Sequence, residues 1–235
     1  MSDVLVCDRL NAAYGESNIL KDVSLRLRKG EVTAVMGRNG VGKTTLLKTI
    51  MGLVPARSGT ISFEGDRIEQ SATDARARRG IAYVPQGREI LPRMSVYENL
   101  QLGLEVLPRG QRSIPESMVY SLFPILHEMR HRMGGNLSGG QQQQLSIARA
   151  LVGNPFVLML DEPTEGIQPS IIQDIEGVLQ QLKSGGRLAI LLVEQYLAFA
   201  QRLADYYYIL DRGAVVFEGN REKLTDDVIR KYLTF

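Results

Sequence analysis

The sequence contains very few of the residues that build disulfides and metal clusters. Its 235 residues include one cysteine, Cys7, and two histidines, His127 and His131. A single cysteine excludes an intrachain disulfide and a cysteine-based metal cluster. The two histidines are one helical turn apart and could bind a metal, but no third ligand or HExxH pattern accompanies them. A solvated helix face is therefore the favoured interpretation.

Long apolar runs and a signal peptide are also missing. The longest apolar runs, FVLML at 156–160 and LAILLV at 188–193, have the length of buried strands, whereas a bilayer span needs about 20 residues. The N-terminus, MSDVLVCDRL, lacks the basic start and the long apolar run of a signal peptide. We therefore expect a soluble cytosolic protein, which would work at a membrane only by docking onto a protein that spans it.

Neither sign of charge is in large excess. The 28 basic and 26 acidic residues give a net charge of +2, so there is no electrostatic argument for nucleic acid, and we expect no nucleic-acid partner. The basic cluster of Arg76, Arg78 and Arg79 is interpreted as a solvated helix face. Hydrophobic residues make up 44% and charged residues 23%, which is typical of a globular chain with one large domain or a core with a sizeable insertion.

The pattern of apolar residues predicts strands that alternate with helices. Period-two alternation predicts two strands at 4–10 and 23–30, with a turn at 15–17. Short apolar runs predict further strands, of which the last two form a hairpin around Arg212 and Gly213. These further strands are 31–37, 60–65, 81–86, 156–160, 187–193, 206–211 and 214–219.

Helices are predicted between these strands. Helices are predicted over 44–53, 116–129, 169–182 and 226–235, with a kink at Pro124 and with Pro169 in the first turn of its helix. A further helix is predicted to start at Ser95, which can form a capping box with Glu98. The alternation predicts an α/β fold whose mostly parallel sheet is covered on both faces. Residues 1–87 and 151–235 are expected to form this core, and residues from about 88 to 150 a helical insertion.

The segment from Gly37 to Thr44, GRNGVGKT, fits the pattern G-x-x-x-x-G-K-[ST] at every fixed position. A predicted strand precedes it and a predicted helix follows. Glycines let backbone N–H groups converge on phosphate oxygens, and the helix N-terminus adds its dipole. Lys43 would reach the β- and γ-phosphates, and the Thr44 hydroxyl would bind Mg²⁺. The alternative is a glycine-rich turn without a ligand.

An acidic pair, Asp161 and Glu162, follows the apolar strand FVLML. It lies at the carboxyl end of a strand, where α/β sheets bind ligands. Asp161 suits the coordination shell of Mg²⁺, and Glu162 could polarise an attacking water. A solvated acidic pair in a loop is the alternative, and the phosphate loop makes it the weaker one.

These motifs resemble the ATP-binding subunits of ABC transporters, and LSGGQ at 137–141 makes the resemblance specific. It covers essentially the whole chain, in the motif order of that family. It implies a P-loop NTPase of the ABC type, with a mostly parallel sheet, an N-terminal antiparallel β part and a helical subdomain insertion. It also implies ATP and Mg²⁺ as cofactors.

The resemblance implies roles for individual residues. The expected catalytic residues are Glu162, Lys43 and Gln195; the expected Mg²⁺ ligands are Thr44, Gln86 and Asp161; and the expected nucleotide contacts are Tyr14, Gly37, Asn39, Gly40, Gly42, Lys43, Thr44, Thr45, Gln86, Ser138, Gly139, Gly140 and Gln141. Tyr14 stands where the family stacks an aromatic ring on adenine; without the family, a tyrosine packed on the sheet would be the better interpretation. Gln86 would also sense the membrane subunit.

Two incomplete phosphate sites in one chain have an explanation in this family. Ser138, Gly139 and Gly140 would close over the ATP that is held by the phosphate loop of a second ATP-binding subunit, identical or related, arranged head to tail. A helix N-terminus with small residues can approach a γ-phosphate closely. The further partners implied are two transmembrane permease subunits and, indirectly, a substrate-binding protein, at the cytoplasmic face of the bacterial inner membrane.

Two residues depart from the wider family. Gln195 stands where the switch histidine is usual, and Gln168 where a loop aspartate is usual. Glutamine can donate a hydrogen bond to a phosphate oxygen, but it cannot carry a positive charge or shuttle a proton. Glu162 is therefore expected to bear more of the role of base, and communication between the two sites is in doubt.

Several segments narrow the resemblance. VEQ, GREILPRMSVYENL and PTEGIQPSIIQDI look like the subfamily that serves importers of branched-chain amino acids and urea, with the urea branch closest. Two other functions remain as alternatives: an ABC-type ATPase that acts on ribosomes or DNA, and a nucleotide-binding scaffold without catalysis. The single cassette with a short insertion argues against the first. Intact Lys43, Thr44, Asp161 and Glu162 argue against the second.

Overall fold

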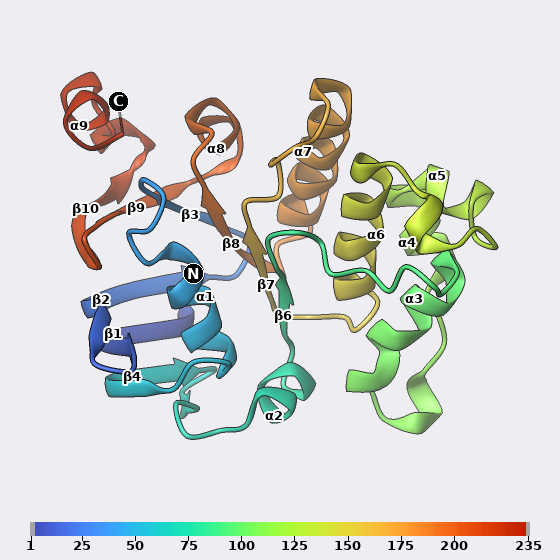
Figure 1. The fold of residues 1–235 in the computed structure, drawn as a ribbon, viewed down its shortest axis with the longest axis horizontal. Coiled ribbons are helices and arrows are strands. Elements are labelled where there is room, and N and C mark those ends of the chain that lie inside the picture. Colours follow the sequence, from blue (N-terminus) through green and yellow to red (C-terminus); the bar gives the residue numbers. More distant parts are fainter. Residues whose placement is uncertain (1–2, 234–235) are drawn as a thin grey trace.

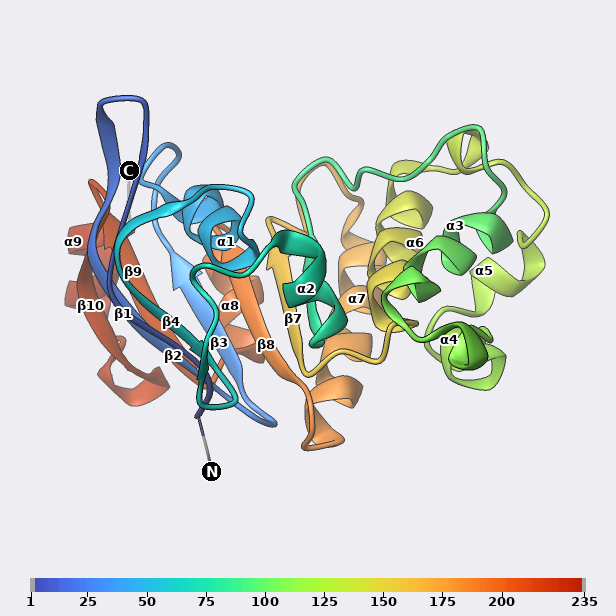
Figure 2. The ribbon, with the colours of Figure 1, turned by 90° about the horizontal axis from the view of Figure 1, so that it is seen from below.

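The computed structural model describes residues 3–233 and places their strands in two sheets (Figures 1 and 2). One is a four-stranded antiparallel sheet in the order β2-β1-β4-β5, and the other is six-stranded in the order β10-β9-β3-β8-β7-β6. The strands are β1 (Asp3–Tyr14), β2 (Ser17–Arg28), β3 (Val32–Met36), β4 (Ala56–Phe63), β5 (Asp66–Arg67), β6 (Ile81–Val84), β7 (Val157–Asp161), β8 (Ala189–Glu194), β9 (Tyr206–Asp211) and β10 (Ala214–Asn220).

Helices cover the six-stranded sheet and extend beyond its β6 edge (Figure 1). The α-helices are α1 (Lys43–Met51), α2 (Thr73–Arg78), α3 (Val96–Gly103), α4 (Glu116–Leu122), α5 (Pro124–Glu128), α6 (Gly139–Leu151), α7 (Pro169–Ser184), α8 (Leu197–Leu203) and α9 (Asp226–Tyr232). Short 3₁₀ helices are η1 (Leu104–Val106), η2 (Arg109–Gln111), η3 (Gly134–Asn136) and η4 (Arg221–Lys223). None of the described helices is long and apolar enough to cross a bilayer.

The six-stranded sheet is parallel except for β10, which pairs antiparallel with β9. Strands β3, β7 and β8 are buried along their whole length, because both faces of the sheet are covered. In β8, Ile190 and Leu192 face the core that contains α7 and α8, whereas Leu191 and Val193 face the core that contains α1. The predicted α/β fold is confirmed.

Helix α1 packs between the two sheets through Leu46, Leu47 and Ile50. Strand β3 leads into the loop at 37–42 that starts this helix, and β7 and β8 run parallel to β3. The carboxyl ends of β3, β7 and β8 therefore meet at one edge of the sheet, where α/β proteins bind ligands. The antiparallel sheet holds α1, and so the glycine-rich loop, from the side opposite the parallel sheet.

Residues 96–151 contain α3 to α6 and contribute no strand to either sheet. The predicted capping box is confirmed, because Glu98 N donates to Ser95 Oγ (3.2 Å) and Ser95 N donates to Glu98 Oε2 (2.7 Å). The predicted kink at Pro124 is wrong. Phe123 is non-helical (φ −134°, ψ 73°), so α4 ends there and Pro124 begins α5. Proline disfavours a helical residue before it and fits the first position of a helix.

The end of the chain largely follows its predicted pattern. The hairpin between β9 and β10 turns at Arg212 and Gly213, both with positive φ, as the sequence predicts. Gly213 also passes close to β2, where a Cβ would lie 2.0 Å from the carbonyl oxygen of Ile19. The last helix is α9, whereas residues 234 and 235 of the predicted helix lie outside the described residues.

Arg76 corrects the interpretation of the basic cluster as a solvated face. Its side chain is 3% exposed, and its guanidinium donates to the carbonyl oxygens of Thr49 (2.9 Å) and Ile50 (2.7 Å) at the end of α1. Two further bonds reach the carbonyls of Ser71 and Glu69. A cation that binds the unpaired carbonyls at a helix C-terminus is stabilising. Arg78 and Arg79 lie on the surface and pair with acidic neighbours.

We expect Arg76→Met to lower the free energy of unfolding by about 2–4 kcal/mol, because it removes a buried donor from four carbonyl groups. Of these, the Thr49 carbonyl keeps a second donor, Gly52 N. Arg78→Met is the matched control on the same helix. Its ion pair with Asp74 is exposed, so its loss should cost less than about 0.5 kcal/mol. Urea unfolding measures both values. Equal stability of the two variants would contradict an anchoring role for Arg76.

Candidate ATP-binding site

The glycine-rich loop between β3 and α1 has a backbone that other residues rarely adopt. Gly37, Gly40 and Gly42 have φ of 151°, 78° and 109°, and a Cβ on Gly37 would lie 2.4 Å from the carbonyl oxygen of Leu210. No side chain among residues 3–233 caps the N-terminus of α1, so its first N–H groups stay available for an anion. Lys43 lies at this end, 4% exposed, and donates to the carbonyl oxygens of Gly37 (2.8 Å) and Arg38 (2.9 Å).

Asp161 lies at the end of β7, within reach of the first turn of α1. Its carboxylate accepts hydrogen bonds from Thr44 Oγ1 (3.2 Å) and Tyr83 OH (3.1 Å). Burial raises the pKa of Asp161, and the bonds from Thr44 and Tyr83 oppose that rise. A hydroxyl beside a buried carboxylate is an all-oxygen donor set that suits a hard cation such as Mg²⁺.

Glu162 projects from the loop after β7 with a left-handed backbone (φ 48°) that non-glycine residues seldom adopt. Its N–H donates to the carbonyl of Val193 at 2.9 Å, which ties this loop to β8. The carboxylate lies 3.4 Å from Lys43 Nζ and accepts from Gln195 Nε2 at 2.7 Å. The carboxylate and the lysine that would hold phosphate are thus side by side.

Two glutamine amides lie around Glu162. Gln195 Nε2 donates to Asn39 Oδ1 (2.7 Å) as well as to Glu162, so it joins the glycine-rich loop to the acidic loop. Gln86 Nε2 lies 3.4 Å from Glu162 Oε2 and donates to Glu165 Oε2 at 2.8 Å. The structure thus brings together predicted residues from four separate segments of the chain.

Two other predicted nucleotide contacts lie around the loop. Tyr14, at the end of β1, is 50% exposed, so its ring has an open face. The hairpin tip that carries it projects on the same side of the molecule as the loop at 37–42 (Figure 2). Thr45 is buried inside α1, and its carbonyl accepts from Thr49 Oγ1 at 2.8 Å.

The LSGGQ segment forms the N-terminus of α6. Ser138 caps the helix in a second capping box, in which Ser138 N donates to Gln141 Oε1 (2.9 Å) and Gln141 N donates to Ser138 Oγ (3.3 Å). A Cβ on Gly139 would meet the Arg88 guanidinium at 3.0 Å, and one on Gly140 would meet the Ile171 side chain at 2.8 Å. Gly140 is therefore needed for packing against α7, whereas a side chain at Gly139 would only displace the flexible end of Arg88.

The tip of α6 does not share a cavity with the glycine-rich loop. Ser138, Gly139 and Gly140 line a groove of about 820 Å³, together with parts of α4, α5, α7 and the loop at 166–168. Within the described chain, none of the residues that line this groove comes from the loop at 37–42. The groove at the tip of α6 is therefore formed without the glycine-rich loop.

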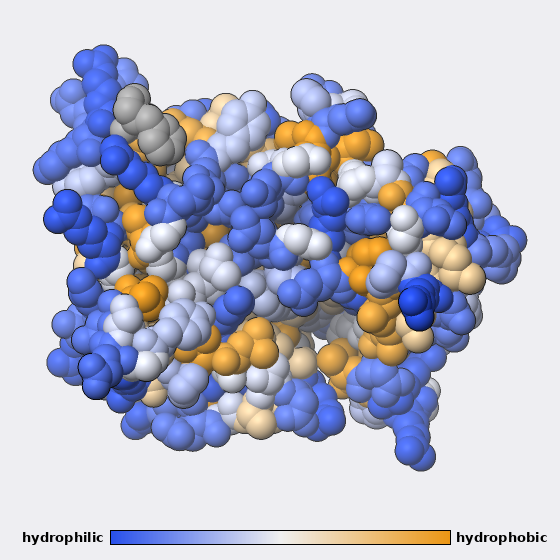
Figure 3. Space-filling view, in the orientation of Figure 1, coloured by the Kyte–Doolittle hydropathy of each residue, from blue (hydrophilic) through white to orange (hydrophobic). Residues whose placement is uncertain are grey.

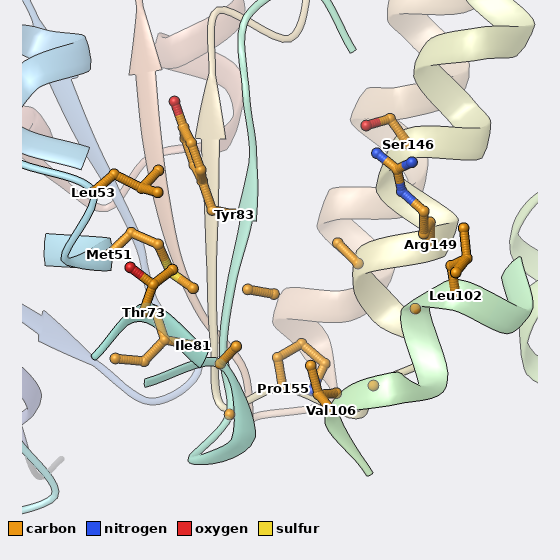
Figure 4. Close-up of a pocket in the computed structure, with 16 residues that line it drawn as sticks. Met51, Leu53, Thr73, Ile81, Tyr83, Leu102, Val106, Ser146, Arg149 and Pro155 are labelled. Atoms are coloured by element: carbon orange, nitrogen blue, oxygen red, sulfur yellow. The ribbon is translucent and has the colours of Figure 1, made fainter. Parts of the chain in front are cut away.

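A second groove, of about 400 Å³, separates the core from the helical part of the chain (Figure 4). Figure 3 shows apolar surface on both sides of a hollow between the places of α2 and α3 in Figure 1. The residues that wall it include Met51, Leu53 and Tyr83 on the core side and Leu102, Val106 and Arg149 on the helical side. Leu53 is 53% exposed, which makes this an open apolar surface.

Sequence reasoning missed three residues at the site. Tyr83 contacts Asp161 from β6, and Glu165 holds the amide of Gln86. Glu194 is buried at the end of β8 and accepts hydrogen bonds from Thr164, Gln195 and Tyr196. Burial raises the pKa of Glu194, against the effect of these bonds. The sequence signal for Glu194 is its place directly after the apolar run at 188–193.

A phosphate loop at the edge of a mostly parallel sheet, with a buried aspartate at the end of a neighbouring strand, defines a P-loop ATPase. The family described as ABC transporter matches residues 20–165. The chain belongs to this family, as an ATP-binding subunit that hydrolyses ATP. Such subunits work with transmembrane permease subunits.

Individual relatives cover nearly the whole chain. The branched-chain amino acid transport ATP-binding protein BraG of Pseudomonas aeruginosa is 39% identical over 213 residues, which span 91% of each chain. The lipopolysaccharide export ATP-binding protein LptB of Escherichia coli is 36% identical, covering 97% of this chain and 96% of LptB. A solved nucleotide-free ATP-binding cassette of an ABC transporter has a TM-score of 0.80 at 30% identity, covering 99% of this chain and 95% of that chain.

Proposed function

We propose that this subunit powers an importer of branched-chain amino acids or urea from the cytoplasmic face of the bacterial inner membrane. The similarity to BraG supports branched-chain amino acids, and the segments GRE and TEGIQPSII favour urea. LptB is similar over almost the whole chain, so export of lipopolysaccharide is a second candidate. The transported molecule touches none of the residues described above, so only a transport assay can identify the substrate.

Uptake of labelled leucine and of labelled urea in a deletion strain tests the substrate. Restoring the gene should restore one of the two uptakes, and restoring it as Glu162→Gln should not. If neither uptake depends on the gene while the outer membrane loses lipopolysaccharide, the importer proposal is wrong and the second candidate holds.

The observation that carries the proposed mechanism is the contact of Lys43, Gln195 and Glu162 at the edge of the sheet. When ATP enters, Lys43 exchanges its bonds to loop carbonyls and to Glu162 for bonds to the β- and γ-phosphates. Glu162, released from the ammonium group, accepts a proton from the attacking water. Thr44, Asp161 and Gln86 would hold Mg²⁺, which neutralises developing phosphate charge when it is bound.

The nucleotide is proposed to be closed in by a second ATP-binding subunit. The exposed Ser138 at the tip of α6, and the groove at this tip that includes no residue of the described glycine-rich loop, support this arrangement. Head-to-tail pairing would place Ser138, Gly139 and Gly140 of one chain over the γ-phosphate held by the other. Backbone N–H groups at a helix N-terminus then stabilise the charge on the transferred group.

We assign the apolar groove of Figure 4 to a cytoplasmic segment of the permease. One wall is joined to the segment that carries Gln86, because Ser146 Oγ donates to the Arg88 carbonyl (2.7 Å) and Arg149 Nη2 to the Glu89 carbonyl (2.8 Å). Arg88 and Glu89 both have positive φ. A permease segment that moves α6 would therefore move the residues next to Gln86.

We expect Gln195→Ala to lower kcat about tenfold, since one hydrogen bond to the reacting groups is worth roughly 1.4 kcal/mol. The Kd for ATP should change little, because Gln195 contacts Glu162 and Asn39 and leaves Lys43 in place. Steady-state hydrolysis and equilibrium nucleotide binding measure the two effects. Unchanged turnover in the assembled transporter would show that Gln195 takes no part in the reaction.

A further inference from the structure

Glu194 is the last residue of β8 and is 2% exposed. One carboxylate oxygen, Oε1, accepts from Thr164 N (3.2 Å) and Thr164 Oγ1 (2.7 Å). The other, Oε2, accepts from Gln195 N (2.9 Å) and Tyr196 N (3.1 Å). Each oxygen therefore serves one of the two loops that reach the ATP site from β7 and β8.

The chemistry of these four bonds requires a carboxylate. All four partners are donors, and an ionised glutamate is an acceptor at both oxygens. Glutamine has nearly the same shape, but its NH₂ group would face either the N–H groups of Gln195 and Tyr196 or the N–H of Thr164. In both orientations at least one backbone N–H loses its acceptor. Burying a charge costs free energy, and a buried carboxylate stays ionised where hydrogen bonds compensate that cost. Glu194 therefore loses hydration free energy on burial, and in return its carboxylate hydrogen-bonds the backbone of two loops.

The two loops are the ones that meet at the reacting groups. Thr164 is two residues beyond Glu162, and Gln195 follows Glu194 directly. The side chains of Glu162 and Gln195 then meet on the nucleotide side at 2.7 Å. Glu194 thus holds the backbone of Gln195 and, two residues after Glu162, the backbone of Thr164.

We propose that Glu194 is a positioning residue for ATP hydrolysis, which sets the spacing between Glu162 and Gln195. This inference rests on the roles proposed above for those two residues. It assigns no contact between Glu194 and nucleotide. The glycine-rich loop comes from the end of β3 and has no hydrogen bond to Glu194 among the described contacts, so ATP binding should be independent of it.

Glu194→Gln in the otherwise intact protein is the direct test. We expect kcat to fall between about tenfold and a hundredfold, as for a small misplacement of reacting groups, while KM for ATP stays within about twofold of the original value. Glu69→Gln is the matched control: this largely buried carboxylate also accepts a backbone N–H, from Ile61, but lies in the turn after β5. It should keep its kcat.

A double-mutant cycle separates positioning from general damage to the fold. In a Gln195→Ala background, Glu194→Gln should cost much less than it does alone, because part of its effect passes through Gln195. The proposal is overturned if the fold-loss of kcat in the double variant equals the product of the two single losses. It is also overturned if Glu194→Gln keeps its kcat. Should Glu194→Gln fail to fold, Thr164→Val decides, because it removes one donor at Oε1. A smaller kcat loss with unchanged KM supports the proposal, and no loss overturns it.

The test of Glu194 and the test of the proposed mechanism use different variants, so either can fail without the other. If Glu162→Gln retains full turnover, the proposed mechanism fails, whatever Glu194 does. If Glu162→Gln is inactive and Glu194→Gln is fully active, the mechanism stands and only the positioning role is rejected.

Discussion

Replacing Glu162 with glutamine should lower the rate of ATP hydrolysis by at least about a hundredfold, the usual contribution of a positioned general base. Glutamine occupies the same space but cannot accept a proton from water. Because Gln195 carries no imidazole, the site offers no second base in the switch position. ATP binding should persist, since Lys43, Thr44 and the loop glycines are unchanged. Loss of the negative charge beside Lys43 (3.4 Å) should if anything favour bound phosphate.

Single-turnover hydrolysis, equilibrium ATP binding and mass measurement together check this result. With MgATP, Glu162→Gln should accumulate as a dimer, because in the proposed mechanism the closed subunits reopen through hydrolysis. Glu64→Gln is a suitable control: Glu64 forms a surface pair with Lys29 far from the sheet edge, and such pairs contribute little. Full turnover by Glu162→Gln would remove Glu162 from the mechanism.

The second large effect is expected at the tip of α6. Ser138→Arg should reduce hydrolysis by about a hundredfold or more, the scale of losing preorganised donors to the reacting phosphate. In the proposed head-to-tail pair, a long side chain would stand where the γ-phosphate held by the other chain approaches. ATP binding by the same chain should remain, because Ser138 lines a groove apart from the glycine-rich loop.

Ser95 provides a matched control for the helix cap. It caps α3 through the same kind of capping box as Ser138, so Ser95→Arg and Ser138→Arg should lose similar stability, about 1 kcal/mol each. Only Ser138→Arg should lose hydrolysis in the associated subunits. Equal ATPase rates for the two variants would mean that the tip of α6 has no part in the reaction.

The sequence was most informative where one local pattern determines one local structure. The apolar runs at 156–160 and 188–193 became the central strands β7 and β8, because a strand that is buried on both faces needs apolar side chains at every position. The spacing of glycines before Lys43 predicted the loop, since few other residues tolerate its positive φ. The capping box at Ser95 is equally local.

Features that depend on distant segments could not be predicted in this way. Arg76 belongs to a helix with an ordinary charged pattern. Only the fold places it on the end of α1, where its partners are 27 and 26 residues earlier in the chain. Glu194 and Thr164 are separated by a strand and a helix, so their bond follows from sheet order. Pro124 was recognised as a disruption, but a break and a kink differ only in the backbone of Phe123.

The central claim is that one chain holds two phosphate-binding elements that serve two different nucleotides. The most direct test is the turnover of MgATP by a preparation held monomeric by dilution, with its mass measured under the assay conditions. The claim predicts that the rate per chain falls far below that of the assembled complex, and that it recovers as subunits associate. A monomer that hydrolyses MgATP as fast as the complex would contradict it.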